Sequence, residues 1–434
     1  MRAIQADVAR SLRTVRVLRA VVERHSSLER AWASECARLP RAAQSDLRDL
    51  CSGSLRHLET YRYALSRLAA PLADDTPLQL LAAATAYELQ HHARKPRSLP
   101  RRLAACCDAL GRPAAAEEIA AAAAALARGG FVDHTAASAL SLPAWLHAAL
   151  AKASPLEAYG ELCLRRPDFL GLHVGGGGAE AYARRLEEEG MEARASELAE
   201  GGVVVLSRPR DVAALPGVAE GRVHVQDLVQ QWGVALLAPR GGRMLDACAA
   251  PGGKTRAWLS RRAEGEVLAL ERSERKARRM EALFREEPRV AVRCGDATAP
   301  AAWWDGKPFD AIIADVPCSA TGIMRSRPEV KVHQTPETVE ALQQTQLAIL
   351  RALWPLLRRG GQLLYMTCSL LSTENEEVVR KFLKDKAISA TIHLPPTPPS
   401  MLGSPLFQTH RHGVTIYPST THQGGFAALL EKNR

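Results

Sequence analysis

The sequence has no pair of cysteines at C-x-x-C spacing and no apolar run of the roughly 18 to 20 residues that a membrane span needs. Its nine cysteines, an odd number, are scattered between Cys36 and Cys368. Neither a disulfide framework nor a zinc site fits this distribution, so we expect a reducing compartment, no metal ion and no membrane segment. Charged residues make up 24% and hydrophobic residues 47% of the chain. This composition excludes disorder, collagen and coiled coil as the dominant state.

The length of 434 residues is enough for two or three domains with a sizeable core. Lys and Arg number 57 against 47 Asp and Glu, which gives a formal net charge of +10. A basic excess suits a polyanion such as nucleic acid, but many basic proteins bind none. Charge alone therefore leaves the partner open.

The pattern along the chain predicts three domains. Residues 1–145 show almost no strand signal and carry Ala, Leu and Arg at helical spacing, which predicts an all-helical domain. Residues 146–235 mix one helical stretch with short β-like runs and predict a small α+β module. Residues 236–434 repeat an apolar strand, a turn and a helix, which predicts a doubly wound α/β domain.

The first 22 residues are rich in Arg and poor in acidic residues, as an organelle transit peptide can be. Apolar residues nevertheless fall on one helical stripe, which favours a first structural helix. The members of that stripe are Val8, Leu12, Val15, Leu18 and Val22. We expect a cytoplasmic protein, with an organelle as the alternative.

Polar residues and one cysteine follow the apolar strands predicted in the α/β domain. Because ligands bind at the carboxyl ends of parallel strands, these residues are the candidate site. They are Asp246, Glu271, Asp296, Asp315 and Cys368.

The run ACAAPGGKT follows the first of these strands and precedes a helix. Its glycines allow the backbone to approach a ligand closely. The end GGKT suggests a phosphate-binding P-loop, but that motif needs Gly at position 248, where the chain has Cys248. The loop is therefore better suited to a nucleoside ligand at the sheet edge.

Two carboxylates are placed to bind such a nucleoside. Glu271 closes the second strand, where an acidic side chain can accept hydrogen bonds from both ribose hydroxyls. Asp296, in CGDA after the third strand, is placed to reach the adenine edge. The alternative for each is that the carboxylate only caps the next helix.

Two further motifs, ADVPCSATG and YMTCS, place a cysteine just beyond an apolar strand. A buried cysteine is usually a small hydrophobic residue, but Cys318 and Cys368 share their predicted sheet edge with Asp315. Methylation at cytosine C5 needs such a set, because C5 is a poor nucleophile until a thiolate adds to C6.

Together these motifs resemble the RNA cytosine-5 methyltransferases that use S-adenosyl-L-methionine. The strong match covers about 237 to 372, and the helical region resembles the NusB-like domain of the bacterial ribosomal members of the Sun (RsmB) type. The resemblance implies a Rossmann-like class I methyltransferase domain, preceded by the helical domain and the α+β module, and methylation of C5 in small-subunit (16S) rRNA to 5-methylcytosine.

The resemblance also implies roles for residues that match the family's motifs. Cys368, in the TC motif, is implied as the nucleophile, and Cys318, in the PC motif, as an aid to proton removal or product release. Asp315 is implied to lie between the cofactor and the target base. The implied cofactor-binding residues are Cys248, Ala249, Ala250, Pro251, Gly252, Gly253, Lys254, Glu271, Asp296 and Asp315.

Basic residues after the PC motif are candidates for RNA phosphates, because the family has basic residues there. They are Arg325, Arg327 and Lys331, and the alternative is a solvated loop. A second candidate patch in the helical domain is formed by Arg97, Arg101 and Arg102.

Two other functions remain open at this point. One is the same reaction on tRNA, and the other is a non-catalytic RNA-binding factor of ribosome assembly that keeps the fold. The presence of both cysteines with Asp315 speaks against the second, because a retired site has no chemical need of all three. DNA cytosine-5 methyltransferases attack with the PC cysteine and generally lack the second one, so the pair favours RNA. We expect a monomer.

Overall fold

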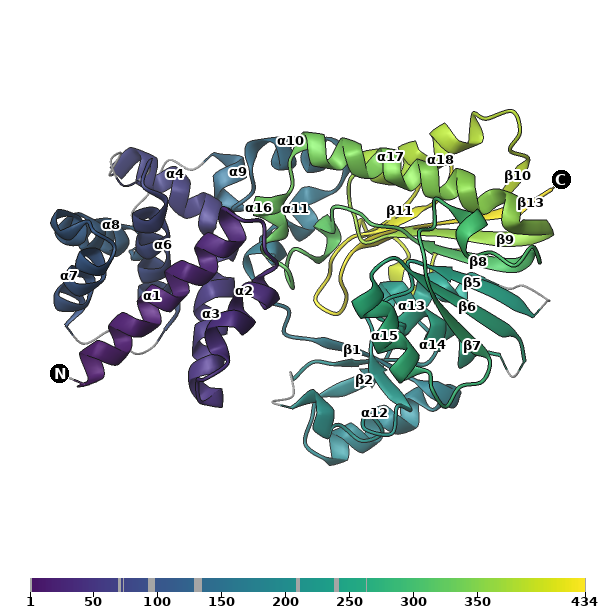
Figure 1. Ribbon diagram of the computed structural model, residues 1–434, viewed down its shortest axis with the longest axis horizontal. Coiled ribbons are helices and arrows are strands. Elements are labelled where there is room, and N and C mark those ends of the chain that lie inside the picture. Colours follow the sequence, from purple (N-terminus) through teal and green to yellow (C-terminus); the bar gives the residue numbers. More distant parts are fainter. Residues whose placement is uncertain are drawn as a thin grey trace. The chain divides into compact units, whose positions relative to one another are not determined.

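The computed structural model describes residues 2–68, 72, 74–92, 98–128, 135–207, 211–237, 242–262 and 264–433. These residues form two compact units. The first contains residues 1–152 together with 163–166 and 324–335, and the second contains the remainder. Figure 1 shows the elements of both units with the labels used below.

The regular secondary structure described in the first unit is helical, as predicted. Its core is built from apolar side chains at helical spacing, including Val15 and Leu18 of the N-terminal helix. That helix is therefore part of the fold, as the apolar stripe predicted. The helices are α1 (Arg2–Val22), α2 (Leu28–Cys36), α3 (Arg41–Arg56), α4 (Leu58–Leu68), α6 (Thr76–His91), α7 (Leu99–Ala109), α8 (Ala116–Ala127), α9 (Ala136–Ala139), α10 (Ala144–Ala153) and, from the later segment, α16 (Val330–His333).

The second unit begins with a small antiparallel sheet in the strand order β2-β3-β1-β4. One face packs on α12 through a cluster that contains Leu172, Leu186 and Val203. The sequence predicted three of its strands and missed the short β2. The elements are α11 (Leu156–Tyr159), β1 (Leu170–Val174), α12 (Ala179–Glu188), β2 (Ala193–Ala195), β3 (Gly202–Val205), β4 (Val223–Val225) and α13 (Leu228–Ala235).

The rest of the second unit is built on a nine-stranded sheet with the order β11-β12-β13-β9-β8-β5-β6-β7, in which β10 also pairs with β13. Strands β5 to β9 are parallel, and β13 is antiparallel to β9. The strands are β5 (Arg243–Ala247), β6 (Glu266–Glu271), β7 (Val290–Cys294), β8 (Phe309–Asp315), β9 (Leu357–Thr367), β10 (Ala390–His393), β11 (Phe407–Thr409), β12 (Val414–Ile416) and β13 (Gly425–Lys432).

Helices cover both faces of this sheet, because successive side chains of each strand point to opposite faces. Met244 and Ile313 face a core shared with α13, α14 and α15, whereas Leu245 and Ile312 face a core shared with α17 and α18. Figure 1 shows the two groups of helices on the two sides. The remaining helices are α14 (Gly253–Leu259), α15 (Glu274–Leu283), α17 (Pro336–Leu353) and α18 (Glu376–Leu383).

The predicted fold class is confirmed: a doubly wound, Rossmann-like sheet follows a helical region and a small α+β module. The predicted strands RMLDACA, GEVLALE, RVAVRCGD, FDAIIADV and GGQLLYMTC correspond to β5 through β9. Their carboxyl ends lie at one edge of the sheet, which is where the candidate residues are found.

Candidate functional site

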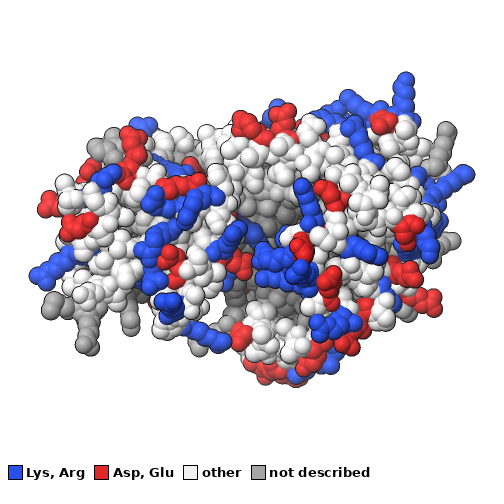
Figure 2. Space-filling model, viewed as in Figure 1, with Lys and Arg blue, Asp and Glu red and all other residues white. Residues whose placement is uncertain are grey.

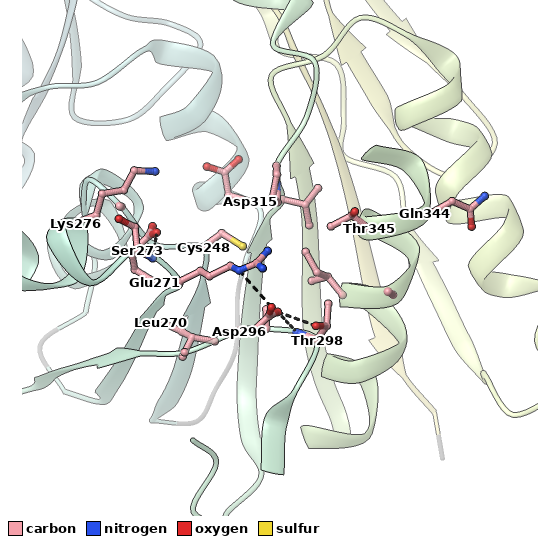
Figure 3. Close-up of a pocket in the computed structure, with 18 residues that line it drawn as sticks. Cys248, Leu270, Glu271, Ser273, Lys276, Asp296, Thr298, Asp315, Gln344 and Thr345 are labelled. Atoms are coloured by element: carbon pink, nitrogen blue, oxygen red, sulfur yellow. Dashed lines mark hydrogen bonds and ion pairs between the residues drawn. The ribbon is translucent and has the colours of Figure 1, made fainter. Parts of the chain in front are cut away.

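A cavity of about 800 Å³ opens at the carboxyl ends of the parallel strands. Five of the predicted cofactor residues contribute to its wall, and α17 closes another side with Gln344, Thr345 and Ala348. Figure 3 shows these side chains around the opening. The predicted residues in the wall are Cys248, Ala250, Glu271, Asp296 and Asp315.

The remaining predicted residues of the loop are not among those that line the cavity. Gly252 has a φ of 101°, and a Cβ atom there would lie 2.9 Å from the ring of Phe284, so only glycine fits without displacement. Gly253 begins α14. Ala249, Pro251 and Lys254 complete the turn without being part of the wall.

Asp246, at the end of β5, is fully buried beneath this loop. Its Oδ2 atom accepts a 2.6 Å hydrogen bond from the hydroxyl of Thr255. Burial raises the pKa of Asp246 to about 7, because an apolar environment disfavours the ionised carboxylate. Cys248 is affected in the same direction, and burial together with the nearby carboxylates raises its thiol pKa to about 12. Cys248 is thus a neutral thiol in the cavity wall.

Glu271 and Asp296 occupy neighbouring strand ends in the cavity wall. Glu271 is 7% exposed, and its Oε1 atom accepts a 2.8 Å hydrogen bond from the backbone N–H of Ser273. Asp296 accepts hydrogen bonds from the backbone N–H and the hydroxyl of Thr298, and Arg272 lies 3.4 Å away (Figure 3). The backbone hydrogen bond from Thr298 is the main cause that lowers the pKa of Asp296. Both carboxylates satisfy local backbone groups and still face the cavity.

Asp315 ends β8 and forms an ion pair with Lys254. The Lys254 Nζ atom lies 2.5 Å from Asp315 Oδ2 and donates a second hydrogen bond of 2.7 Å to Gln230 Oε1. The lysine is only 6% exposed, whereas the side chain of Asp315 is 25% exposed, so water reaches the carboxylate end of the pair and partly screens the charge interaction. This places one positive and one negative charge at the strand ends beside the cavity.

The two predicted cysteines are brought together. The Sγ atoms of Cys318 and Cys368 lie 3.4 Å apart although 50 positions separate the residues, and both side chains are partly exposed. The loops that carry them are paired through backbone groups, since Gly322 N–H donates a 2.8 Å hydrogen bond to the carbonyl of Cys368. The site therefore presents two adjacent sulfurs, which the separate sequence motifs do not reveal by themselves.

Three residues at this site were missed by the sequence analysis. Gln230, on α13, accepts from Lys254. Gln346, on α17, and Glu374, before α18, contact the loops that carry the cysteines. The signal for Glu374 was present in the acidic run TENEE, which begins five positions after Cys368. The glutamines stand on otherwise ordinary helices and gave no sequence signal.

The prediction that Arg325 and Lys331 contact RNA phosphates is wrong in this structure. They belong to the first compact unit and are 2% and 1% exposed. Lys331 Nζ donates to the carbonyls of Arg56, Cys163 and Leu140 at 3.1, 3.2 and 3.5 Å. Burial lowers the Lys331 pKa to about 8. In this environment the basic side chain satisfies backbone carbonyls in the core of its unit and does not reach solvent.

The other basic candidates differ in exposure. Arg327 is exposed, as a phosphate contact requires. Arg101 is also exposed, but Arg102 is 1% exposed and pairs with Glu88 at 2.6 Å. Arg102 is therefore a core residue, which corrects the predicted patch, and Arg97 lies outside the described residues. On the visible face of the molecule, Lys and Arg are spread out with Asp and Glu among them (Figure 2).

In the described parts of the chain, no group of three or more His, Cys, Asp and Glu side chains is arranged to hold a metal ion. Among the described helices, none combines the length and apolarity needed to cross a bilayer.

The chain is similar to known methyltransferases. A family model described as 16S rRNA methyltransferase RsmB/F matches residues 234–431. The protein named ribosomal RNA small subunit methyltransferase B from Xanthomonas campestris is 36% identical over 88% of this chain and 89% of its own length. The protein of the same name from Pseudomonas syringae is 34% identical over 86% of each chain.

The chain belongs to the RsmB/F methyltransferase family. Solved structures agree in fold. The crystal structure of PH0851 covers 98% of this chain and 99% of its own at a TM-score of 0.76 and 19% identity. A methyltransferase homologue from Pyrococcus horikoshii covers 68% of this chain and 97% of its own at a TM-score of 0.56 and 20% identity. The site described above is therefore the candidate active site of a methyltransferase-family domain.

Proposed function

We propose that this protein transfers a methyl group from S-adenosyl-L-methionine to C5 of a cytosine in small-subunit (16S) rRNA, through a covalent bond between Cys368 and C6. The observation that carries the proposal is the pair of sulfurs 3.4 Å apart. A family methyltransferase that only needed to bind its substrate would gain nothing from two adjacent thiols, whereas C5 chemistry needs a sulfur nucleophile.

The cavity fits the cofactor in the nature and placement of its polar groups. Glu271 uses Oε1 for Ser273, so the carboxylate still has a second oxygen for the ribose hydroxyls, and Asp296 is placed for the adenine side. The loop Cys248–Lys254 would hold the methionine part. When bound, the cofactor supplies an electrophilic methyl group.

The chain's own residues prepare the cytosine. The Cys368 thiolate forms a bond to C6, and the displaced electron pair of the C5–C6 double bond raises the electron density at C5. The Asp315 carboxylate accepts a hydrogen bond from the N4 amino group at the N3/N4 edge of the base, which orients the ring for this addition. Lys254, paired with Asp315 at 2.5 Å, fixes the orientation of that carboxylate. The cytosine enters unpaired or flipped out of its helix.

After C5 has taken the methyl group, the enzyme has to be released. The C5 proton passes to water, the C5–C6 double bond forms again and the bond from C6 to sulfur breaks. Cys318 lies at hydrogen-bonding distance from Cys368, so its thiol stabilises the departing thiolate. A variant without Cys318 is expected to remain attached to RNA.

The names of the relatives support the proposed target. Two proteins named as small-subunit rRNA methyltransferases match this chain over 86% to 88% of its length. The exposed Arg327 remains proposed as an RNA contact. The bacterial origin of the relatives supports action in the cytoplasm, and a monomer stays our expectation.

The test is transfer of labelled methyl groups to unmodified small-subunit rRNA, with tRNA and the Cys368→Ala variant measured in parallel. We expect 5-methylcytosine in the rRNA and none with the variant. Label in tRNA alone would overturn the target. Normal transfer by the variant would overturn the nucleophile, and a lack of label in all RNA despite cofactor binding would favour an assembly factor.

A further inference from the structure

A buried carboxylate, Glu374, lies where the two cysteine-bearing loops meet. It ends a short turn, Ser372–Glu374, just before α18, and its exposed fraction is 0%. Burying a charged side chain costs free energy unless neighbouring donors satisfy it. Its surroundings therefore indicate what it does.

Three donors from three separate segments reach the oxygens of Glu374. Oε1 accepts a 2.7 Å hydrogen bond from the backbone N–H of Ser319 and a 3.0 Å hydrogen bond from Gln346 Nε2. Oε2 accepts a 2.5 Å hydrogen bond from the hydroxyl of Ser369. The carboxylate thus joins β8, β9 and α17 at the end of the sheet.

Two of these donors immediately follow the cysteines in sequence. Ser319 comes directly after Cys318 and Ser369 directly after Cys368, so one side chain is tied to both loops within a residue of each sulfur. The serine hydroxyls also lie 3.0 Å from each other. Fixing these two positions fixes the separation of the sulfurs.

The residue after Glu374, Asn375, also makes hydrogen bonds to the loop that carries Cys368. Asn375 Nδ2 donates a 3.0 Å hydrogen bond to the carbonyl of Ser369, and its Oδ1 atom accepts one of 2.6 Å from the Thr367 hydroxyl. These bonds flank Cys368 on both sides. Glu374 and Asn375 therefore both hold the loop that carries Cys368. Of these two residues, Glu374 also contacts the loop that carries Cys318.

We propose that Glu374 is a positioning residue, which sets the geometry of the Cys318 and Cys368 pair and whose negative charge, held one residue from Cys318, disfavours loss of the Cys318 proton. Cys318 is then the thiol that aids release, and Cys368 is the nucleophile. The inference rests on the proposed function, in which these two roles are distinct. The established family membership does not assign any role to Glu374.

The electrostatics of the pair agree with this geometry. The pKa of Cys318 is raised, first by its hydrogen bond to Cys368 and by burial, and further by the charges of Cys368 and Glu374. Tyr365 is a further titratable group that interacts with this cluster, and its pKa is raised mainly by burial and also by Glu374 and Cys318. Tyr365 donates a 2.6 Å hydrogen bond to the carbonyl of Glu374 and stays a neutral phenol.

The decisive variant is Glu374→Gln, which keeps the shape and removes the charge. Glu374→Ala removes all three hydrogen bonds to the carboxylate. Ser369→Ala removes one of these three. Glu377→Gln is the matched control, since it neutralises a partly exposed carboxylate on the adjoining helix α18. All are made in the full chain.

The first readout is independent of activity: the rate at which iodoacetamide alkylates each cysteine between pH 6 and 10, resolved by peptide mass spectrometry. In Glu374→Gln we expect Cys318 to be alkylated about tenfold faster at pH 8, with its pH midpoint lowered. The exposed Cys294 serves as an internal standard in every variant. An unchanged Cys318 profile would overturn the charge effect.

The second readout is methyl transfer over the same pH range. Glu374→Gln is expected to lower kcat about tenfold and to change its pH profile, with KM for RNA and cofactor affinity unchanged, while Glu377→Gln matches the wild type. A kcat equal to that control would overturn the positioning role. If Cys368→Ala stayed active, the proposed mechanism would be wrong. If the alkylation profile of Cys318 still changed as expected in Glu374→Gln, the effect of the Glu374 charge on Cys318 would stand.

Discussion

Two buried lysines, one in each compact unit, show how neighbours decide the role of a residue. Lys254 is 6% exposed and Lys331 is 1% exposed. Lys254 faces a carboxylate, Asp315, and a glutamine oxygen, whereas Lys331 is surrounded by three backbone carbonyls. The first arrangement has a charged pair at the sheet edge, beside the cavity, and the second has a cation whose hydrogen bonds go to backbone carbonyls inside a helical core.

The difference teaches that a basic residue close in sequence to an active-site motif is not thereby part of the site. Lys331 lies 13 positions after Cys318, but the segment 324–335 belongs to the first unit. Lys254 lies 64 positions before Cys318 and is nevertheless tied to Asp315 on the strand that leads to it. Sequence distance and function are unrelated in these two cases.

The largest effect is expected from Lys254→Met. Loss of the cation leaves Asp315 without its ion pair and misplaces the carboxylate that we propose contacts the base, so methyl transfer is expected to fall about a hundredfold. The measurement is kcat for labelled methyl transfer at saturating RNA. Thermal unfolding in the same preparation verifies that the protein remains folded, and wild-type kcat would remove Lys254 from the mechanism.

The corresponding change in the helical unit, Lys331→Met, is expected to act on stability instead. Three buried carbonyls lose their donor, at a cost of about 2 kcal/mol in the free energy of unfolding. Hydrogen exchange resolved at α3 and at residues 163–166 locates the loss. Lys152→Met, an exposed lysine of the same unit, is the control. Equal exchange in both variants would contradict a structural role for Lys331.

The pH dependence of Lys331 is expected to distinguish it further. Its pKa of about 8 in the folded chain is below the ordinary value of 10.5, so the unfolded state binds more protons between these values. Stability therefore rises with pH across this window, and the penalty for the buried charge is fully present below pH 8. Wild type should gain stability relative to Lys331→Met between pH 8 and 10, as followed by chemical denaturation. A constant difference would refute the lowered pKa.

The smallest effect is expected from Arg327→Ala, the exposed basic residue of the same segment. Loss of one phosphate contact should raise KM for rRNA about threefold to tenfold, leave kcat unchanged and reduce the salt dependence of binding. The comparison is with Arg101→Ala in the helical unit, which tests the other exposed candidate. A KM that does not change with Arg327→Ala would leave the whole segment 324–335 structural.

The sequence predicted the α/β region better than the basic residues. Strands β5 to β9 are continuous apolar runs between helical segments, and such runs have one stable arrangement as a parallel sheet covered on both faces. The positions of Glu271, Asp296 and Asp315 at the strand ends followed from that arrangement, and all three line the cavity. Short strands such as β2 and β10 have too few residues for their alternation to be recognised.

The sequence by itself determined the sheet, the cavity-forming loop and the two cysteine motifs, because these depend on local apolar patterns and on glycines at fixed positions. Only the tertiary structure decided that Cys318 and Cys368 are 3.4 Å apart, that Glu374 joins their loops and that Lys331 and Arg325 are buried. These outcomes depend on which segments pack together across 50 or more positions. Whether a charged side chain is solvated or buried depends on the residues that pack around it. A single sequence does not show which residues these are.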